Sequence, residues 1–468
     1  MELLNIFAKI LFIANGIIIF FFFQIIVYGI FSYIYYFRQK KKFHLTLEKL
    51  ENIASTLNKE LPVITILIPA KNEREIIGTT IDRFLSLNYP KEKLNLLIIL
   101  DEKEVLTTPF EETTHYVVYQ KQNHYNKLYG REIIIVTSVP VGFDGEYKGK
   151  ILPTPVKSTK PRALNWGLNF IPSSTQILGF YDADAFPERD TLLYVAYKYI
   201  TKSSNSNLLL QGPVVQVRNY LHLEPFNKIY AVAQAITHEW YLPALLLYLP
   251  FIGGTNFFIE YHLLLKVKGF NKNALSEDLE LGCRLFVETN TWPEFMPYIT
   301  TEQTPPTYKA FFHQRTRWAS GYIQVLKEIL IKKTYFKKKF FISFMLIFYG
   351  ILPWFAAQIL TITTIGMLIL SFSGLSHFFE FLPSYTKIFL FVMNIGYILF
   401  LLYYFNYAVK KIYIIDNGEK KYKFILEYLT FLLMPIAAAL GTLPYTYGFL
   451  ISFFTNNIEW KKTIRTKE

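Results

Sequence analysis

The sequence predicts an α/β domain with a doubly wound, Rossmann-like sheet, inserted between transmembrane helices. Between residues 60 and 217, apolar runs rich in β-branched residues alternate with segments of helical periodicity, as in sheets covered on both faces. Long uncharged runs lie near both ends of the chain, and a span needs only about 20 such residues. The 468 residues are 52% hydrophobic with a mean hydropathy of +0.23, which is high for a soluble protein.

The N-terminal apolar run predicts a first transmembrane helix within residues 1–37. It is too long for the core of a signal peptide and lacks a small-residue cleavage site, so we expect it to be retained. The basic stretch RQKKKFH follows directly. Because Lys and Arg collect on the cytoplasmic side of a span, residues 38–339 are expected to form a cytoplasmic domain of an integral membrane protein. Its first half covers about 60–217 and its second half 218–339.

The C-terminal region, 340–457, predicts further membrane segments. Two spans are expected at 340–372 and 388–409, each next to lysine-rich sequence. The last apolar stretch, 424–457, contains Pro435, Gly441 and Pro444. It either crosses once or is broken into a hairpin or an interfacial helix. The basic tail at 458–468 favours the second alternative, which keeps the tail on the cytoplasmic side.

Composition limits the partners and the chemistry. The formal charge of +13 suits anionic lipid headgroups or phosphorylated ligands. No zinc-finger or RNA-binding signature is present, so nucleic acid is not an expected partner. Cys283 is the single cysteine, which excludes an internal disulfide framework and a zinc site built from cysteines.

Several strands and helices can be placed from periodicity. The apolar runs at 61–70, 93–101, 132–138, 176–184 and 208–217 predict strands, and 73–87, 161–170 and 275–286 predict helices. The segment 241–254 is too short to span a membrane and predicts a buried or interfacial piece. In a doubly wound sheet, the binding crevice lies at the carboxyl ends of the strands.

Acidic residues follow three of these strands. Glu73 follows the first, Asp101 ends the second, and Asp182 and Asp184 end the fourth. Each alone is typical of a turn. Together at one edge they favour a divalent cation such as Mg²⁺ or Mn²⁺, and Asp182 and Asp184 are expected on one face because strand side chains alternate. Neither common phosphate-binding loop is present, so basic groups such as Lys160 are expected to help hold phosphates.

The second half adds three polar clusters. FIGGTNFFIE, 251–260, predicts either a close backbone approach to a ligand or a tight turn. In LSEDLELGCRLF, Ser276 is a plausible N-cap, and Asp278 in the first turn is either a capping residue or a general base. In HQRTRWASGY, Gln314, Arg317 and Trp318 share one helix side, which suits phosphate and sugar binding or an interfacial basic helix.

Seven motifs in this order resemble the membrane-integrated, inverting glycosyltransferases of family 2, the group that includes cellulose, hyaluronan and chitin synthases. They are ILIPAKNE, LIILDE, KPRALN, DAD, GGTNFF, SED and QRTRW, and the resemblance covers about residues 60–330. SED has Ser where the family has Thr, which keeps the hydroxyl. The resemblance implies a GT-A-type domain.

The resemblance also implies roles for individual residues. By this resemblance, the donor nucleotide is bound by Glu73, Asp101, Lys160 and Asp182, and the metal by Asp184 and Asp182. Asp278 is the implied catalytic base. The residues implied at the diphosphate and the acceptor entrance are Gln314, Arg315, Arg317 and Trp318, and those of the acceptor loop are Gly253, Gly254, Thr255 and Asn256. The implied reaction moves a sugar from a nucleotide-diphosphate sugar, UDP favoured, to a lipid or glycan hydroxyl with formation of a β-linkage.

Two alternatives remain beside this hypothesis. A processive synthase that secretes its polymer shares the motifs, but three firm spans favour a single transfer or a channel completed by a homo-oligomer. A transporter or channel with a ligand-sensing domain would carry ionisable residues inside its spans, and the spans here are nearly free of them.

Overall fold

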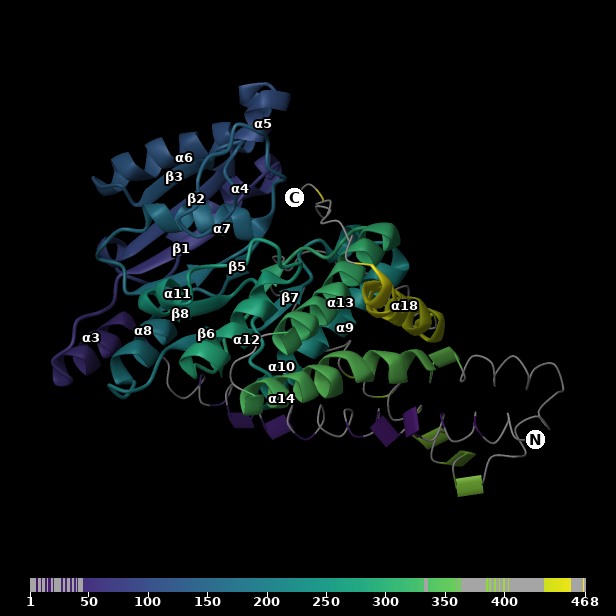
Figure 1. Cartoon of the computed structure of the whole chain (residues 1–468). Coiled ribbons are helices and arrows are strands. Elements are labelled where there is room, and N and C mark those ends of the chain that lie inside the picture. The colour runs from purple at the N-terminus through teal and green to yellow at the C-terminus, as the bar shows by residue number, and fades with distance from the viewer. Residues whose placement is uncertain are drawn as a thin grey trace.

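A computed structural model describes residues 45–331, 336–359 and 433–455, with isolated positions elsewhere. Its centre is a seven-stranded sheet in the order β3-β2-β1-β4-β8-β6-β9 (Figure 1). The strands are β1 (Ile64–Pro69), β2 (Leu94–Asp101), β3 (Ile134–Val139), β4 (Ile177–Phe180), β6 (Leu209–Gln211), β8 (Phe257–Glu260) and β9 (Glu294–Phe295). The prediction of an α/β domain is confirmed. The sheet is mixed, however, because β8 runs antiparallel to both β4 and β6.

Helices cover both faces of the sheet, which explains the apolar strands. Ile64, Ile66 and Ile68 of β1 belong to the core formed with α3 (Leu47–Thr56), α4 (Arg74–Leu85), α6 (Thr114–Tyr129) and α8 (Thr191–Thr201). Leu67 faces the other way, into the core formed with α7 (Lys160–Gly167), α11 (Tyr261–Lys266) and α12 (Glu277–Thr289). Alternate residues of one strand therefore serve two helical layers.

The strand predicted at 208–217 is wrong as a single element. It divides into β6 and β7 (Val214–Gln216), and β7 joins a second sheet, β5-β10-β7, with β5 (Phe186–Pro187) and β10 (Thr300–Glu302). Pro213 cannot donate a ladder hydrogen bond. A Cβ on Gly212 would lie 2.3 Å from the side-chain nitrogen of Asn256, so the chain turns where only glycine fits. After this turn, β7 pairs with β10 in the second sheet.

The second half of the chain is mainly helical. α9 (Pro225–Ile236) is followed by a π-helical turn, η6 (Thr237–Tyr241), by α10 (Leu242–Tyr248), and later by α13 (Tyr308–Ile331). Leu242 and Leu246 of α10 are buried whereas Leu247 is exposed, so the segment predicted at 241–254 is buried along one side. The helices of this half lie beside the carboxyl end of the sheet (Figure 1).

One helix among the described residues, Phe336–Ile359, is long and apolar enough to cross a membrane, with 24 residues and a mean hydropathy of 2.0. It includes α14 (Phe336–Met345) and the π-helical η7 (Leu346–Ile351). It contains the first part of the span predicted at 340–372. The predicted spans at 1–37 and 388–409, and residues 363–372, lie outside the continuously described residues.

The stretch predicted at 424–457 to be broken contains one continuous helix, α18 (Met434–Phe454), so a hairpin is wrong for this part. Pro444 removes the N–H that would bond to the carbonyl of Leu440. The hydroxyl of Tyr308 donates to that carbonyl instead, at 2.9 Å. α18 lies along α13 (Figure 1), and a Cβ on Gly448 would approach the carbonyl of Thr316 to 2.6 Å. The small residue permits this close packing.

Candidate active site

Three carboxylates gather at the carboxyl end of β4. Asp182 and Asp184 lie beyond the strand, which ends at Phe180, so the expectation that they share a strand face is wrong. The turn nevertheless brings them to Glu302, the last residue of β10, and one carboxylate oxygen of each lies within 4.8 Å of the others. Three carboxylates with no nitrogen or sulfur ligand suit a hard cation such as Mg²⁺ or Mn²⁺. The residues present therefore fit the metal that the sequence predicts.

The buried Asp184 is held by groups from two other segments. The backbone N–H of Gln303 donates to its Oδ2 at 2.9 Å, and Arg218 Nη1 donates to its backbone carbonyl at 2.8 Å. The side-chain amide of Gln303 also pairs with the backbone N–H and carbonyl of Thr466, each at 3.0 Å. This position of the C-terminal tail therefore lies beside the acidic cluster.

Lys160, the first residue of α7, joins the acidic turn to two other motifs. Its ammonium contacts Asp182 Oδ1, donates to the carbonyl of Gly254 at 2.8 Å, and lies 3.9 Å from Glu277 Oε1. Burial alone would lower the pKa of Lys160, but Asp182 and Glu277 outweigh it and hold the pKa above its ordinary value. Lys160 is therefore a permanent cation among carboxylates.

Asp278 stands in the first turn of α12, next to Glu277. The pKa of Asp278 is raised to about 7, mainly by burial and next by the negative charge of Glu277. The Leu279 N–H, Lys160 and Arg317 oppose this rise. Gly254 has φ +72°, and a Cβ on it would lie 2.6 Å from Asp278 Oδ2, so a glycine is needed there on both counts. A carboxylate with this pKa can accept a proton near neutral pH.

Ser276 occupies the N-cap position of α12, as predicted, but its side chain makes no capping hydrogen bond. Its Oγ packs instead against α13, where a Cβ on Gly321 would meet it at 2.0 Å. The orientation of the Asp278 helix is therefore fixed partly by the packing of α12 on α13.

The loop from Gly253 to Asn256 ties the acidic turn to the sheets. The N–H of Gly253 donates to Gln211 Oε1 at 2.8 Å, and Thr255 Oγ1 accepts from the N–H of Asp182 at 3.3 Å. Asn256, with φ +53°, is fully buried and uses both ends of its side-chain amide inside the protein. The loop lies against Asp182 and Asp278, but Asn256 faces the protein interior rather than a ligand.

Residues of α13 contact both the second sheet and the segment that precedes α12. Arg315 is buried; its Nη2 donates to Gln216 Oε1 at 3.0 Å, and its guanidinium lies 3.8 Å from the centre of the Trp318 ring. Gln216 is opposite Glu302 in the register of β7 and β10. Arg317 donates to the carbonyl of Leu275 at 3.1 Å and lies near enough to Asp278 to lower its pKa. Gln314 is buried on the same helix.

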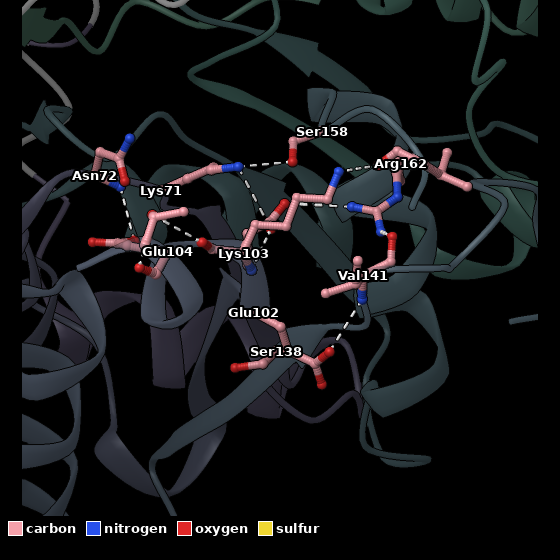
Figure 2. Close-up of polar contacts among 12 residues, drawn as sticks. Lys71, Asn72, Glu102, Lys103, Glu104, Ser138, Val141, Ser158 and Arg162 are labelled. Carbon is pink, nitrogen blue, oxygen red and sulfur yellow. Dashed lines mark hydrogen bonds and ion pairs between the residues drawn. The ribbon is translucent and has the colours of Figure 1, made fainter. Parts of the chain in front are cut away.

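The remaining predicted residues, Glu73 and Asp101, belong to a second polar cluster at the ends of β1 and β2. Figure 2 shows Lys71, Lys103 and Arg162 of this cluster. Asp101 accepts from the N–H of Lys103 at 3.0 Å, and its two oxygens pair with Lys71 at 3.6 Å and Arg162 at 3.3 Å. Glu73 is buried at the start of α4, and its N–H donates to a threonine hydroxyl. These side chains lie at the same edge of the sheet as the acidic turn.

Three residues of these clusters escaped the sequence analysis. Glu302 lies in TTEQT, which carries no motif, and only the pairing of β10 with β5 and β7 brings it to Asp184. Glu104 is buried and accepts from two N–H groups and the hydroxyl of Thr114. Arg162 lies inside KPRALN, but its pairing with Asp101 is a long-range contact that no local pattern shows.

Comparison with known proteins places these features in a family. The sequence profile of Glycosyl transferase family group 2 matches residues 179–443, more than half of the chain. The chain is 28% identical over 307 residues to "Probable glycosyltransferase YdaM" of Bacillus subtilis (strain 168), covering 63% of this chain and 65% of that protein. It is 25% identical over 303 residues to a beta-monoglucosyldiacylglycerol synthase of Synechocystis sp., covering 62% of this chain and 55% of that one.

The chain thus spans between about half and two thirds of the length of the curated relatives that it matches. Among solved structures it is similar to a mannosyltransferase, PcManGT from Pyrobaculum calidifontis in complex with GDP-Man and Mn²⁺. The identity is 16%, the coverage is 86% of this chain and 96% of that chain, and the TM-score is 0.44. The profile match decides the classification: this chain belongs to Glycosyl transferase family group 2.

Proposed function

We propose that this protein is a membrane-bound, inverting glycosyltransferase that moves a sugar from a nucleotide-diphosphate sugar to a lipid hydroxyl and forms a β-glycosidic bond. The observation that carries the proposal is Asp278, a carboxylate whose pKa is raised to about 7 and which adjoins Gly254 and Lys160. Lys160 in turn contacts Asp182 of the acidic cluster. Lys160 therefore lies between the proposed base, Asp278, and the acidic cluster that is proposed to hold the cation and the donor diphosphate.

The proposed reaction is a single displacement. An acceptor hydroxyl gives its proton to a carboxylate oxygen of Asp278 as its oxygen attacks the anomeric carbon. The bond from that carbon to the diphosphate breaks on the opposite face, and the electron pair leaves with the nucleotide. An α-linked donor then yields a β-linked product. The pKa of Asp278 keeps much of the carboxylate ionised at neutral pH while retaining useful basicity.

The donor diphosphate is assigned to the acidic cluster and its neighbouring cations. Asp182, Asp184 and Glu302 would hold Mg²⁺ or Mn²⁺, which stabilises the negative charge of the leaving nucleotide. Lys160 and Arg317 supply positive charge from the protein, since arginine and lysine both bind phosphate oxygens. Glu73 and Asp101, in the second polar cluster, are assigned to the nucleoside.

A lipid acceptor is supported by two observations. Three relatives of this chain are named beta-monoglucosyldiacylglycerol synthases, which points to diacylglycerol as the acceptor to test first. The apolar helix Phe336–Ile359 and α18 adjoin α13, so a lipid could reach the site from a membrane. We place the protein in the membrane-integrated branch of the family, with its catalytic domain in the cytoplasm.

The test is a transfer assay with the purified full-length chain in lipid nanodiscs. UDP- and GDP-sugars are screened with Mn²⁺ or Mg²⁺ for nucleotide release, and the best donor is then used in labelled form with diacylglycerol. We expect one added sugar on the lipid, and an anomeric proton coupling typical of a β-linkage. Labelled polymer of high mass would instead favour the processive synthase. Absence of nucleotide release and of sugar transfer for every donor would refute the glycosyltransferase activity.

A further inference from the structure

The contact between Lys160 and Asp182 engages one of the three carboxylates that would hold a metal. Asp182 is one of the three carboxylates that come within 4.8 Å of one another. Its Oδ1 already accepts a hydrogen bond from the Lys160 ammonium. The same side chain is therefore offered to two cations.

We propose that Lys160 and the divalent cation compete for Asp182, so that the metal binds tightly only together with the donor diphosphate, which takes over Lys160. The inference rests on the proposed function, because it assigns the diphosphate to this site. It adds that the metal and the donor bind cooperatively, and that Lys160 is the residue that couples the two binding events.

The competition follows from distance and burial. A cation held by the acidic cluster lies within a few ångströms of the Lys160 ammonium, since both bind Asp182. The side chain of Lys160 is only 18% exposed, so water screens their repulsion poorly. The ammonium of Lys160 is held at this position by its contacts with Asp182 and with the carbonyl of Gly254. It must move, or the metal must bind weakly.

The surroundings of Lys160 offer it another position. Its remaining partners are the carbonyl of Gly254 at 2.8 Å and Glu277 Oε1 at 3.9 Å, neither of which belongs to the acidic cluster. A diphosphate between the two cations would supply oxygens to both, because phosphate oxygens bind lysine and Mg²⁺ or Mn²⁺ alike. A bound nucleotide would therefore relieve the competition between Lys160 and the metal for Asp182.

Thermodynamic linkage makes the inference measurable. If the nucleotide raises the affinity for the metal by some factor, the metal must raise the affinity for the nucleotide by the same factor. Coupling of this kind is usually about 5- to 150-fold. Without a charge at residue 160, the metal should bind well on its own and the coupling should fall.

The experiment is a titration of the full-length protein with Mn²⁺, in which electron paramagnetic resonance reports the free ion, with and without UDP or GDP. For the wild type we expect the better nucleotide to lower the Kd for Mn²⁺ at least about fivefold. Lys160→Met should bind Mn²⁺ about fivefold or more tightly without nucleotide and lose most of the coupling. Lys160→Arg keeps the charge and should keep the coupling.

Lys121→Ala is the matched control, because it removes a lysine–carboxylate contact, with Asp82 at 2.6 Å, on the paired helices α4 and α6. It should leave both affinities unchanged. Equal Mn²⁺ affinity of the wild type with and without a bound nucleotide would overturn the inference whether or not Lys160→Met folds. Unchanged nucleotide-free affinity in Lys160→Met would do the same. In both cases sugar transfer by the wild type would leave the proposed function standing.

Discussion

Asp101 and Asp182 both follow strands of one sheet, yet the surroundings of the two carboxylates differ. Asp101 has two cations and a backbone N–H to itself, from Lys71, Arg162 and Lys103. Asp182 shares one lysine with the neighbouring Glu277 and lies among further carboxylates. The charge of Asp101 is offset by Lys71 and Arg162, whereas the acidic cluster that contains Asp182 holds more negative charge than Lys160 offsets.

The difference separates two uses of buried carboxylates. A carboxylate that is paired and hydrogen-bonded positions the chain, and removing its partner costs stability. A group of carboxylates with too few cations is costly to the free protein and is relieved by a ligand. We therefore expect substitutions around Asp101 to lower stability first, and substitutions around Asp182 and Asp278 to lower activity first.

The largest effect is expected for Asp278→Asn. An amide cannot accept the acceptor proton, so transfer should fall by about 10²- to 10⁴-fold, the usual contribution of a general base. Donor binding should change little, because Asp278 is not among the carboxylates assigned to the metal. Sugar transfer and nucleotide affinity, measured on the same preparation, check both parts.

Glu288→Gln is the control for this substitution, since it makes the same chemical change at an exposed position of α12. It should retain full activity. Transfer by Asp278→Asn within a few-fold of the wild type would show that another group is the base. The expectation that substitutions around Asp278 lower activity first would then be wrong.

The next effect concerns Glu302, the carboxylate that completes the acidic cluster. Glu302→Gln keeps the shape but removes one charge, and we expect Mn²⁺ to bind at least about tenfold more weakly, as a lost charge interaction of about 1.4 kcal/mol would give. The melting temperature should stay the same or rise, because the mutant has less buried repulsion. Mn²⁺ affinity and thermal unfolding without metal test these expectations. A lowered melting temperature would mean that Glu302 stabilises the folded protein.

How far the sequence predicted this site depends on the range of the contacts. The strands at 64–69, 94–101 and 177–180 and the acids at their ends were predictable, because periodicity and strand ends are local features. Glu302 was not, since it meets Asp184 only through a second sheet. The split between β6 and β7 depends on the fit of Gly212 against Asn256, which no local pattern contains.

The same limit applies to the membrane-proximal part. Pro444 was one of the residues at which the sequence allowed a break in 424–457, since proline removes one helix hydrogen bond. The helix continues because Tyr308, 136 positions earlier, donates to the carbonyl that Pro444 leaves without its usual partner. A sequence pattern shows the lost bond but not its replacement.

A third prediction tests the cluster around Asp101. Arg162 and Asp101 are only 2% and 5% exposed. Arg162→Met removes one partner of a buried ion pair, which typically costs about 3–5 kcal/mol, and should lower the melting temperature by roughly 10 °C. Asp101→Asn added to it should recover part of the loss, because the orphaned charge is gone. Differential scanning fluorimetry of both variants measures this.

The control for Arg162 is the half-exposed pair of Lys121 and Asp82, at 2.6 Å. Lys121→Ala should cost no more than about 1 kcal/mol, since exposed pairs are screened. If Arg162→Met were as stable as Lys121→Ala, the cluster around Asp101 would not stabilise the fold as its hydrogen bonds indicate.

The smallest effect is a shift of the pH profile by Glu277→Gln. Transfer requires ionised Asp278, so its rate should rise with pH through about 7 and then level off. The charge of Glu277 contributes to the raised pKa of Asp278. Its removal lowers that pKa, so the acidic limb should move to lower pH by up to about one unit. The rate at pH 6, relative to the plateau, should therefore rise in Glu277→Gln and stay unchanged in Glu288→Gln. A limb that stays in place or moves to higher pH would mean that Glu277 does not act on the base through its charge.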